Sequence, residues 1–516
     1  MGLFLVITQW FNLHEVSSTP TNPSDQKYVL SKSTYIRGLQ CKKSLFLYKK
    51  FIQLRDPLSS EQAAIFSRGT NIGLIAQGLF PGGTDARSFC KSSNEAIKKT
   101  QELINSGEEI IYEAAFQHDQ VLVYLDILIK KDGKWFAYEV KSSVKVSKTY
   151  MNDAALQYFV ITQNGLLLEA MNILYINKEY QRKKELQLEQ FFLTKEVSDY
   201  CKGQTEDIQA KLVDLKEVIK LEAIPEISIG EHCNSPYPCD FMSYCWKNVP
   251  NDSVFNIMGA NRSELFSMYN AGIKSIKDIE NEEVYNREQR IQIWSYKNKK
   301  AFASKKGLND FFDTLTYPIY FLDIEICMPA LPEFEGNYPY QHTPYQYSLH
   351  YKQNADAELS HIDFLAESMG NPSRQFLDHF LAHIGNKGSI LIFDDSAERR
   401  VLNQLVKEMP ERKAEMDKVL NRFVDISQVF MKRHYYNPLM KGSLSLKNIL
   451  PALLPGIDYS KLAISNGVTA LAAFDKLRNP QADLFEIDEL RKNLLEYCKM
   501  DTYAIAMITE KLREFI

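Results

Sequence analysis

The sequence has no pronounced charge of either sign: 61 lysine and arginine residues against 65 aspartates and glutamates leave a formal net charge of −4 over 516 residues. No whole-chain attraction therefore points to nucleic acid, and any such site has to be a local patch or has to recruit cations to acidic groups. Eight cysteines in so long a chain do not make a disulfide scaffold. They favour a reduced, cytoplasmic compartment, in which clustered cysteines usually bind metal.

Long apolar runs, internal repeats and low-complexity tracts are also missing from the sequence. The early apolar run at residues 3–11 is interrupted by Thr8 and Gln9 and follows no basic residue, so we expect neither a signal peptide nor a membrane anchor. With 45% hydrophobic and 24% charged residues, the composition excludes disorder, collagen and coiled coil as the main state. At roughly 150 residues per domain, the length predicts two to four domains.

Changes in the sequence pattern divide the chain into four segments. We predict an N-terminal extension over residues 1–26 and a mixed helix and strand domain over 27–250. A polar helical connector over 251–315 then leads into a second strand-bearing domain over 316–516. The predicted fold class is α/β for both strand-bearing domains.

The clearest local signal is a hairpin over residues 121–143. Two apolar runs flank Asp132-Gly133, and Asp-Gly is the strongest short hairpin signal when it forms a two-residue turn. That turn fixes the pairing of the two strands and places Asp126 directly opposite Glu139. Lys141 lies two residues beyond Glu139 and therefore shares its face.

Directly opposed carboxylates destabilise a sheet. At about 5 Å and an effective dielectric of about 20, the repulsion is roughly 3 kcal/mol. A bound Mg²⁺ would reverse the sign of this energy, and a nearby lysine can stabilise charge that develops on a phosphate. The alternative is a solvated hairpin face with a chance Glu-x-Lys tripeptide.

Asp126 together with Glu139-x-Lys141 resembles the PD-(D/E)XK motif of nucleases, in its RecB-type branch. The resemblance implies that the two acids bind Mg²⁺ or Mn²⁺ and that Lys141 assists hydrolysis of a phosphodiester bond. It also implies a role for Gln157, in a helix predicted over residues 149–161, as part of the Gln/Tyr motif of that family.

Three positions near this motif depart from the family or stay open. Tyr158 follows Gln157 directly, whereas the tyrosine of many relatives falls four residues after the glutamine. Glu113, on a predicted strand, is either a further acid of the site or an exposed strand residue. Relatives often carry a metal-binding histidine in their first helix, and residues 68–73 of this chain contain none, which leaves the number of metal ions open.

Three cysteines, Cys233, Cys239 and Cys245, are evenly spaced with five residues between neighbours, and Cys41 lies far upstream. Zinc sites usually show pairs two to four residues apart, so this spacing argues against zinc. It resembles RecB-type nucleases with an iron–sulfur cluster, including the CRISPR-associated exonucleases. The resemblance implies that these four thiolates hold a [4Fe–4S] cluster. The remaining cysteines are predicted to be ordinary thiols: Cys90, Cys201, Cys327 and Cys498.

A second set of acidic residues begins in an apolar segment over residues 317–326, which we predict to be a buried strand. Asp323 and Glu325 are two residues apart and therefore share one face, where burial without a partner costs several kcal/mol. Glu398 lies in the first turns of a helix that follows a predicted strand over 389–393. Tyr497 and Asp501 lie one turn apart in a predicted C-terminal helix.

This order of acids resembles the DEDD exonucleases of the RNase H-like fold. The two strand acids match the first motif, and the helix pair matches the third motif in its tyrosine form. Glu398 stands where the second motif normally has Asp, and Asp425 is the other candidate, with a helix cap as its alternative role. The resemblance implies two-metal hydrolysis in which Tyr497 positions the attacking water.

The ordered set over about residues 28–515 resembles a family of bacterial fusions that join an iron–sulfur RecB-type nuclease to a DEDD-like domain. It implies a PD-(D/E)XK (restriction endonuclease-like) domain, a helical connector and an RNase H-like α/β domain. We predict a cytoplasmic, metal-dependent nuclease with no membrane partner, in which DNA is favoured over RNA and exonuclease action is favoured.

Two alternatives stay open: an RNA 3′ exonuclease driven by the C-terminal domain, or a non-catalytic nucleic-acid-binding scaffold with a structural metal. Cleavage polarity stays open too, as does a helicase or a repair or defence protein as a further partner. Beside the second acidic set, the aromatic-rich loop over residues 329–347 is predicted either to stack bases or to pack as a tyrosine- and proline-rich loop.

Overall fold

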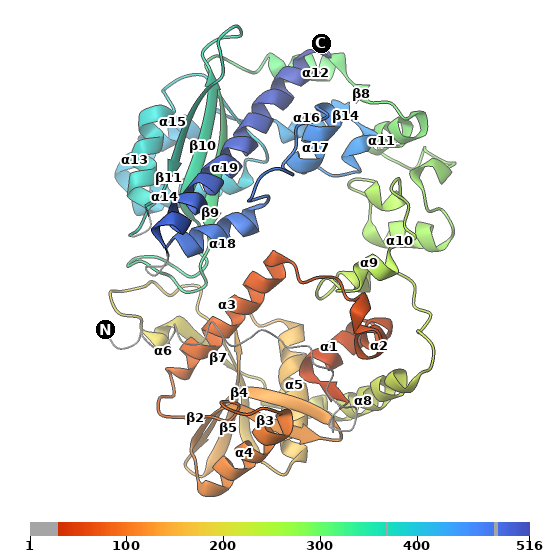
Figure 1. Cartoon of the computed structure of the whole chain (residues 1–516), viewed down its shortest axis with the longest axis vertical. Helices are drawn as coiled ribbons and strands as arrows, with labels where there is room; N and C mark the ends of the chain where they lie inside the picture. Colours follow the sequence, from red (N-terminus) through yellow and green to blue (C-terminus); the bar gives the residue numbers. More distant parts are fainter. Residues whose placement is uncertain (1–28, 368–369, 479–482) are drawn as a thin grey trace.

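The structure is a computed structural model that describes residues 29–367, 370–478 and 483–516. The predicted extension over residues 1–26 lies outside these ranges. Figure 1 shows two bodies that each contain a sheet covered by helices, the N-terminal half below and the C-terminal half above. The protein is thus of the mixed α/β class, as predicted. Across the described ranges, no helix combines the length and the apolar character needed to span a membrane.

The N-terminal half is built on a seven-stranded mixed sheet in the order β2-β3-β4-β5-β6-β7, with β1 paired to β4. The strands β3, β4 and β5 are antiparallel, whereas β5 and β6 are parallel and therefore need a crossover helix between them. The strands are β1 (Leu30–Ser31), β2 (Thr84–Asp85), β3 (Ile110–His118), β4 (Val121–Lys131), β5 (Lys134–Lys141), β6 (Leu168–Ile176) and β7 (Phe192–Glu196).

The crossover helix α5 (Lys148–Gln163) runs where the sequence predicts a helix over 149–161 and buries Leu156, Phe159 and Val160 in the core against the sheet. This helix therefore has a fixed face toward β4 and β5. The other helical segments of this half are α1 (Lys32–Gln40), α2 (Lys42–Lys50), η1 (Ile52–Leu54), α3 (Ser60–Gln77), α4 (Ser93–Ser106), α6 (Leu188–Phe191), α7 (Ser198–Gly203) and α8 (Thr205–Lys220).

The predicted hairpin is confirmed in its turn and in its register. Asp132 and Gly133 have φ angles of 52° and 77°, and two positive φ angles are what a type I′ turn requires. Lys131 pairs with Lys134 and Ile127 pairs with Tyr138. Extended by one pair, this register sets Asp126 opposite Glu139, and the backbone N–H of Val140 donates to Asp126 Oδ2.

The segment between the two halves is helical, as predicted, but it shares its core with the C-terminal half. Leu265, Ile276 and Ile293 lie in the same hydrophobic cluster as Phe321 and Ile505. A two-residue strand, β8 (Phe302–Ala303), also pairs with β14 (Tyr435–Tyr436). Two short helical segments, η2 (Glu231–Cys233) and α9 (Met242–Cys245), precede the predicted connector. The connector itself contains β8 and the helical segments η3 (Val254–Asn256), α10 (Arg262–Asn270), η4 (Ile276–Asp278), α11 (Arg287–Asn298) and α12 (Lys305–Phe312).

The C-terminal half contains a five-stranded sheet in the order β11-β10-β9-β12-β13. The central strand β9 is antiparallel to β10 and parallel to β12. It begins and ends close to the strand predicted over 317–326. The strands are β9 (Ile319–Cys327), β10 (Thr343–Lys352), β11 (Ser360–Leu365), β12 (Ser389–Ile392), β13 (Phe423–Asp425) and β14 (Tyr435–Tyr436).

The long last helix, α19 (Leu484–Arg513), packs across one face of β9 and β10, so the predicted C-terminal helix is confirmed (Figure 1). Phe321 lies in the cluster on the α19 side, and Leu322 lies in the cluster on the side of α13 and α14. The other helical segments are α13 (Ser373–His383), α14 (Ser396–Glu408), η5 (Pro410–Arg412), α15 (Lys413–Leu420), α16 (Ser427–Met431), η6 (Pro438–Met440), α17 (Leu446–Leu453) and α18 (Gly467–Leu477).

The loop between β9 and β10, residues 328–342, packs against the N-terminal half. Backbone N–H of Arg182 donates to the carbonyl of Asn337 at 2.9 Å, and the Tyr340 hydroxyl donates to the carbonyl of Ser142, which directly follows β5. Helix α3 also contacts α18, and Figure 1 shows it reaching up to the C-terminal half. The two halves are therefore joined by direct packing as well as by the connector.

Two aromatic rings at the end of the loop predicted over 329–347 are buried. Tyr345 stacks on Phe474 with ring centroids 4.0 Å apart, and Tyr347 packs edge-on against Phe380. Both tyrosines have 0% exposed surface. At these two rings the packed alternative is confirmed, and stacking of bases on them is excluded.

Candidate active sites and metal centres

The hairpin site, defined as Asp126, Glu139, Lys141 and Gln157, converges on one buried carboxylate. Glu139 accepts hydrogen bonds from Lys141 Nζ at 2.8 Å and from Gln157 Nε2 at 2.6 Å. Asp126 lies beside it and accepts from the backbone N–H of Val140 at 2.6 Å. The structure thus brings together all four residues that the sequence predicts for this site.

Two charged residues that contact the hairpin site were missed by the sequence analysis. Lys32 Nζ lies 2.7 Å from Glu139 Oε1, and Lys141 Nζ lies 2.8 Å from Asp153 Oδ2. Asp153 precedes Gln157 by four residues on α5, a spacing that puts both on one helix face, so that pattern could have revealed it. No local pattern marks Lys32, because it reaches the site only through the pairing of β1 with β4.

The charges of this site are only partly balanced. Burial, together with the charge of Glu139, raises the pKa of Asp126 to about 8. Burial opposes ionisation of Glu139 too, but Lys141 and Lys32 outweigh it and hold the pKa of Glu139 below its ordinary value. At neutral pH Glu139 is therefore a paired carboxylate, whereas Asp126 retains its proton until another cation approaches.

Glu113 extends this row of acids to a third strand. Tyr112 pairs with Ile127 and Ala114 pairs with Leu125, so Glu113 lies opposite Asp126 on β3. Its φ angle is 50°, and burial raises its pKa despite the nearby Arg87. Of its two predicted roles, this placement favours a further acid of the site.

Tyr158 behaves differently from its neighbour Gln157. The Gln157 side chain is fully buried and reaches Glu139, whereas Tyr158 is packed against the hydrophobic core of the N-terminal half. Adjacent positions on a helix face different directions, so of these two neighbours Gln157 is the one that contacts Glu139.

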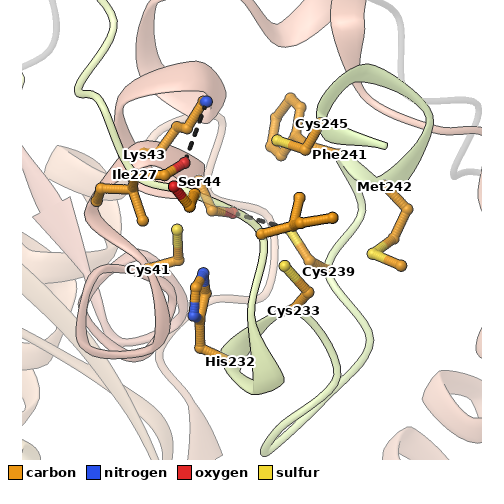
Figure 2. Close-up of a pocket in the computed structure, with 12 residues that line it drawn as sticks. Cys41, Lys43, Ser44, Ile227, His232, Cys233, Cys239, Phe241, Met242 and Cys245 are labelled. Atoms are coloured by element: carbon orange, nitrogen blue, oxygen red, sulfur yellow. Dashed lines mark hydrogen bonds between the residues drawn. The ribbon is translucent and has the colours of Figure 1, made fainter. Parts of the chain in front are cut away.

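The four cysteines predicted to act together, the cysteine quartet, surround one small cavity (Figure 2). Ser44, His232 and Phe241 also line this cavity. Cys41 lies between α1 and α2, whereas the other three lie between η2 and the end of α9. Segments about two hundred residues apart in the sequence therefore meet here: Cys41, Cys233, Cys239 and Cys245.

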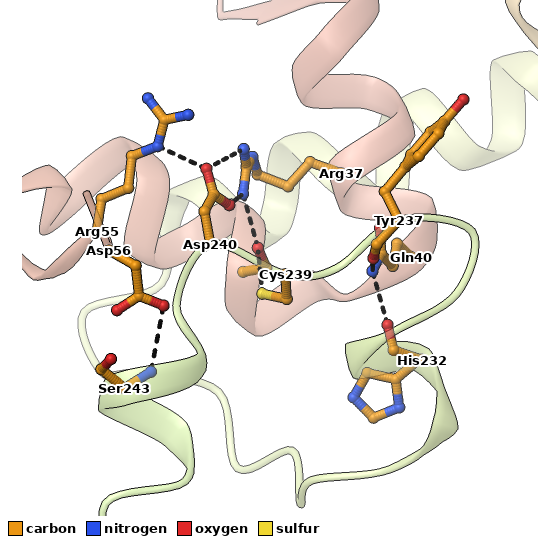
Figure 3. A network of polar contacts seen from close by, with 10 residues as sticks. Arg37, Gln40, Arg55, Asp56, His232, Tyr237, Cys239, Asp240 and Ser243 are labelled. Carbon is orange, nitrogen blue, oxygen red and sulfur yellow. Dashed lines mark hydrogen bonds and ion pairs between the residues drawn. The ribbon is translucent and has the colours of Figure 1, made fainter. Parts of the chain in front are cut away.

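A polar network holds the two cysteine-bearing segments together (Figure 3). Asp240 accepts from both Arg37 and Arg55, with Arg37 Nη2 3.0 Å from Asp240 Oδ2. Gln40 Nε2 donates to the carbonyl oxygens of His232 and Tyr237, each at 2.7 Å. Because Arg37 and Gln40 precede Cys41 and their partners flank the other cysteines, the thiols are kept close by bonds outside the cavity.

The thiols of the quartet do not have the spacing of a tetrahedral zinc site. Tetrahedral zinc with Zn–S bonds of ~2.3 Å would bring the sulfur atoms to about 3.8 Å from one another. Within the described ranges, no three Sγ atoms of the quartet all lie within 4.8 Å of one another. The side chains as they stand therefore do not form such a site.

The C-terminal acidic site, defined as Asp323, Glu325, Glu398 and Asp501, is assembled from three elements. Asp323 and Glu325 lie on β9, Glu398 lies in the first turn of α14, and Asp501 lies on α19. Glu398 and Asp501 are buried, whereas Asp323 and Glu325 are partly buried. Tyr459 donates to Asp501 Oδ1 at 2.6 Å.

The pKa values of the four acids rise together. Burial is the first cause for each, and it raises the pKa of Asp323 to about 6 and that of Asp501 to about 8. Asp323 adds repulsion to the other three, and Glu398 adds repulsion to Glu325. The four carboxylates therefore lie close enough to destabilise one another as anions, which is the donor set that divalent cations favour.

Asp425 binds backbone donors in this structure. It accepts from the backbone N–H groups of Asp394 at 3.0 Å and of Ser427, the first residue of α16, at 2.8 Å, a contact at a helix start that resembles the cap left open by the sequence. Glu398 is consequently the second acid that the structure brings to Asp323.

Tyr497 lies at this site, where burial and then Asp501 raise the pKa of its hydroxyl above the ordinary value. Three further side chains escaped the sequence analysis, namely Tyr345, Tyr459 and Cys498. Of these only Cys498 carries a sequence signal, because it stands three residues before Asp501 on one helix and therefore near it in space. The two tyrosines come from distant segments.

The fold and these clusters define a two-part α/β protein with two acidic centres and a cysteine cluster. The family model described as "Domain of unknown function (DUF2779)" matches residues 320–445, a stretch that includes Asp323, Glu325 and Glu398 but ends before α19. Comparison with curated proteins gives no match.

Proposed function

We propose that the protein is a metal-dependent nuclease that hydrolyses phosphodiester bonds and has two active sites. The observation that carries the proposal is the convergence of Lys141, Gln157 and Asp126 on Glu139 across an established hairpin register. The pair of acids, the lysine ammonium and the glutamine amide are together the groups expected of a PD-(D/E)XK site. The arrangement supports that fold for the N-terminal half.

At the hairpin site, Asp126 and Glu139 would hold Mg²⁺ or Mn²⁺, which when bound polarises a phosphate and activates water. The protein's own groups do the rest. Lys141, held between Glu139 and Asp153, offers an ammonium to the charge that develops on the phosphate. Gln157 fixes the second oxygen of Glu139 and so keeps the first oriented.

At the C-terminal acidic site, the four carboxylates would hold the divalent cations of a two-metal hydrolysis. Tyr497 would position the attacking water through its hydroxyl, next to Asp501. The strand order β11-β10-β9-β12-β13, with two acids on the central strand, supports an RNase H-like fold for this half. DNA is the proposed substrate, attacked from an end.

The cysteine quartet would hold a [4Fe–4S] cluster. Four thiols around one cavity, with no three Sγ atoms at the mutual distances of a zinc site among the described residues, support this group. Through these four thiolate ligands, Cys41 would be tied to the segment that follows the N-terminal sheet. Protein purified without air should then contain about four iron and four sulfide per chain, and stoichiometric zinc without sulfide would contradict this part of the proposal.

The activity test uses matched variants of each site on labelled single- and double-stranded DNA and RNA, with Mg²⁺ or Mn²⁺. In an Asp323→Ala background, Asp126→Ala and Lys141→Ala should abolish cleavage, whereas Lys134→Ala, in an exposed pair on the same hairpin, should retain it. In an Asp126→Ala background, Asp501→Asn should abolish shortening, whereas exposed Asp488→Asn on the same helix should retain it.

The two sites can fail independently in this design. Undiminished cleavage by the hairpin variants would remove the N-terminal site, and undiminished shortening by Asp501→Asn would remove the C-terminal one. Cleavage of RNA alone, dependent on Asp501, would replace the DNA proposal by an RNA exonuclease. If the wild type cleaves no nucleic acid and the folded variants still bind it, the protein is a non-catalytic scaffold.

A further inference from the structure

We propose that one cation position of the C-terminal acidic site is completed by a thiolate, with Cys498 Sγ binding the ion beside Asp323 and Glu325. The site would then take a zinc-class divalent ion in preference to Mg²⁺ at this position. The inference rests on the proposed nuclease function and names the ion class of one of its two sites.

The geometry of three side chains carries the inference. One ligand atom each from Asp323, Glu325 and Cys498 lies within 4.8 Å of the other two, and Cys498 Sγ is 3.4 Å from Asp323 Oδ2. Cys498 has 0% exposed surface and stands on α19 between Tyr497 and Asp501. A sulfur atom thus lies within the oxygen cluster, where a hydroxyl or a carboxylate would be the usual donor for Mg²⁺.

A second observation indicates a missing cation at the same place. Glu398 Oε2 is buried without a hydrogen-bond partner, in a residue that is 6% exposed. The charge of Glu398 raises the pKa of Glu325, and the charge of Asp323 raises that of Glu398. An unsatisfied buried carboxylate oxygen is costly. Among the described residues, Lys447 offsets the charge of Asp501, but no lysine or arginine does so for Asp323.

Ligand chemistry then selects the ion. Carboxylates alone suit Mg²⁺ and Mn²⁺, whereas thiolate ligands favour zinc and related softer ions. On binding, the Cys498 S–H bond breaks, its proton passes to solvent, and the sulfur lone pair forms the bond to the ion. Three anionic ligands around one divalent ion leave a net negative charge, which a second cation near Glu398 and Asp501 would offset.

Cys327 shows how a thiol without this role is placed. It lies on the same strand as the two acids, yet its Sγ donates to the carbonyl of Thr343 at 3.5 Å and belongs to the apolar core. Cys201 is buried in α7 of the other half. Among the hydrogen bonds of the described residues, neither of these thiols donates to a carboxylate, whereas Cys498 donates to Asp323.

The test measures metal binding by the full-length protein, purified without air so that the cysteine quartet keeps any metal it holds. The variants are Cys498→Ser, Cys201→Ser as a matched buried thiol, and Asp323→Ala. Titration calorimetry with Zn²⁺ and with Mn²⁺ is combined with Co²⁺ absorption, in which a cobalt–thiolate charge-transfer band reports sulfur ligation.

We expect Cys498→Ser to weaken Zn²⁺ binding by at least about tenfold and to remove one cobalt–thiolate band, whereas Mn²⁺ affinity changes by less than about threefold. Cys201→Ser should change neither. Asp323→Ala should remove the same band, because the thiolate and the carboxylate bind one ion. This last measurement also decides the question if Cys498→Ser fails to fold, since a band from the quartet would persist in Asp323→Ala.

Two negative results have different meanings. If Zn²⁺ affinity and the cobalt band are unchanged in Cys498→Ser while Asp323→Ala abolishes Mn²⁺ binding, the thiolate inference is overturned and the acidic site stands. If Asp323→Ala changes no metal binding at all, the C-terminal active site of the proposed function falls together with the inference. A cobalt band that survives Asp323→Ala in every respect also overturns the inference.

Discussion

Glu139 is the residue on which the hairpin site depends, and Lys32 is the partner that distinguishes its environment. Lys32 is the first residue of α1, whose N-terminus is capped by Ser31, and its ammonium lies 2.7 Å from Glu139 Oε1. Two lysines therefore share one carboxylate oxygen of Glu139, whose side chain is 2% exposed. In the protein without metal, Lys32 supplies part of the positive charge that a divalent cation would bring.

Replacing Lys32 by Met should consequently destabilise the metal-free protein. The hydrogen bond to a buried charged group is lost, which costs roughly 1.5–3 kcal/mol of the free energy of unfolding. Lys134→Met, which breaks an exposed ion pair with Glu169, should cost less than about 1 kcal/mol. Urea unfolding in EDTA measures both, and equal effects of the two variants would show that Lys32 contributes no more than a surface lysine.

The buried acids predict a pH dependence of the metal-free protein. The pKa values of Asp126 and Asp501 are raised from 3.8 to about 8, so between about pH 4 and pH 8 the folded protein binds more protons than the unfolded chain. The free energy of unfolding should therefore fall as pH rises through this window, by at least about 1.4 kcal/mol, the value of one pKa unit. Glu139 has a lowered pKa, so its contribution to the pH dependence of stability lies below this window.

Denaturant titrations at fixed pH test this expectation. Saturating Mn²⁺ should reduce the dependence of the free energy of unfolding on pH, because it stabilises the carboxylates as anions. In the absence of metal, Asp501→Asn should also reduce this dependence. A free energy of unfolding that rises with pH in EDTA across the window would contradict the assignment of these acids as buried groups with raised pKa values.

Among the elements, the hairpin of β4 and β5 decides whether two acids face each other. A shift of one residue would turn Glu139 to the opposite face of the sheet. The type I′ turn prevents that shift, because it needs positive φ angles at Asp132 and Gly133. Helix α5 then adds Asp153 and Gln157 from a single face, so two elements create the site.

Gly133→Val should therefore act on both stability and function. A β-branched residue at a φ of 77° costs about 1–2 kcal/mol and weakens the register, so metal binding by Asp126 and Glu139 should fall with it. Asp132→Asn is the matched control, because asparagine tolerates positive φ. Calorimetry with Mn²⁺ in an Asp323→Ala background measures the effect. If Gly133→Val is destabilised but its metal affinity is unchanged, metal binding at the site does not depend on the turn.

In the whole molecule, two connections join parts that are far apart in the sequence. The cysteine quartet joins the start of the N-terminal half to the segment that leads out of it. The β9–β10 loop joins the strand that carries Asp323 to the end of β5, since Tyr340 contacts Ser142 next to Lys141. One short loop therefore links the strand that carries Asp323 to the residue that follows Lys141.

Cys239→Ala should lose bound iron and thermal stability together, because a cluster that joins distant segments restricts the unfolded chain. Cys90→Ala, at a thiol outside the quartet, should retain both. Iron and sulfide analysis is paired with thermal unfolding of protein prepared without air. Full iron content in Cys239→Ala would show that the quartet does not bind the metal as a unit.

The sequence by itself determined the features that depend on neighbours in the chain. Asp132-Gly133 fixed a turn and, through it, the opposition of Asp126 and Glu139, because hairpin register follows from turn geometry. Apolar runs marked β9 and β12, and the spacing of Tyr497 and Asp501 placed both on one helix. The even spacing of three cysteines marked them as a group.

Only the tertiary structure decided which distant groups complete these sites. Lys32 reaches Glu139 because β1 pairs with β4, and Tyr459 reaches Asp501 from another segment. The thiol of Cys498 was predicted to be ordinary, and it became a candidate ligand only when packing of α19 on β9 brought it to Asp323. Contacts of this kind follow from how buried faces pack together, and local sequence patterns do not predict that packing.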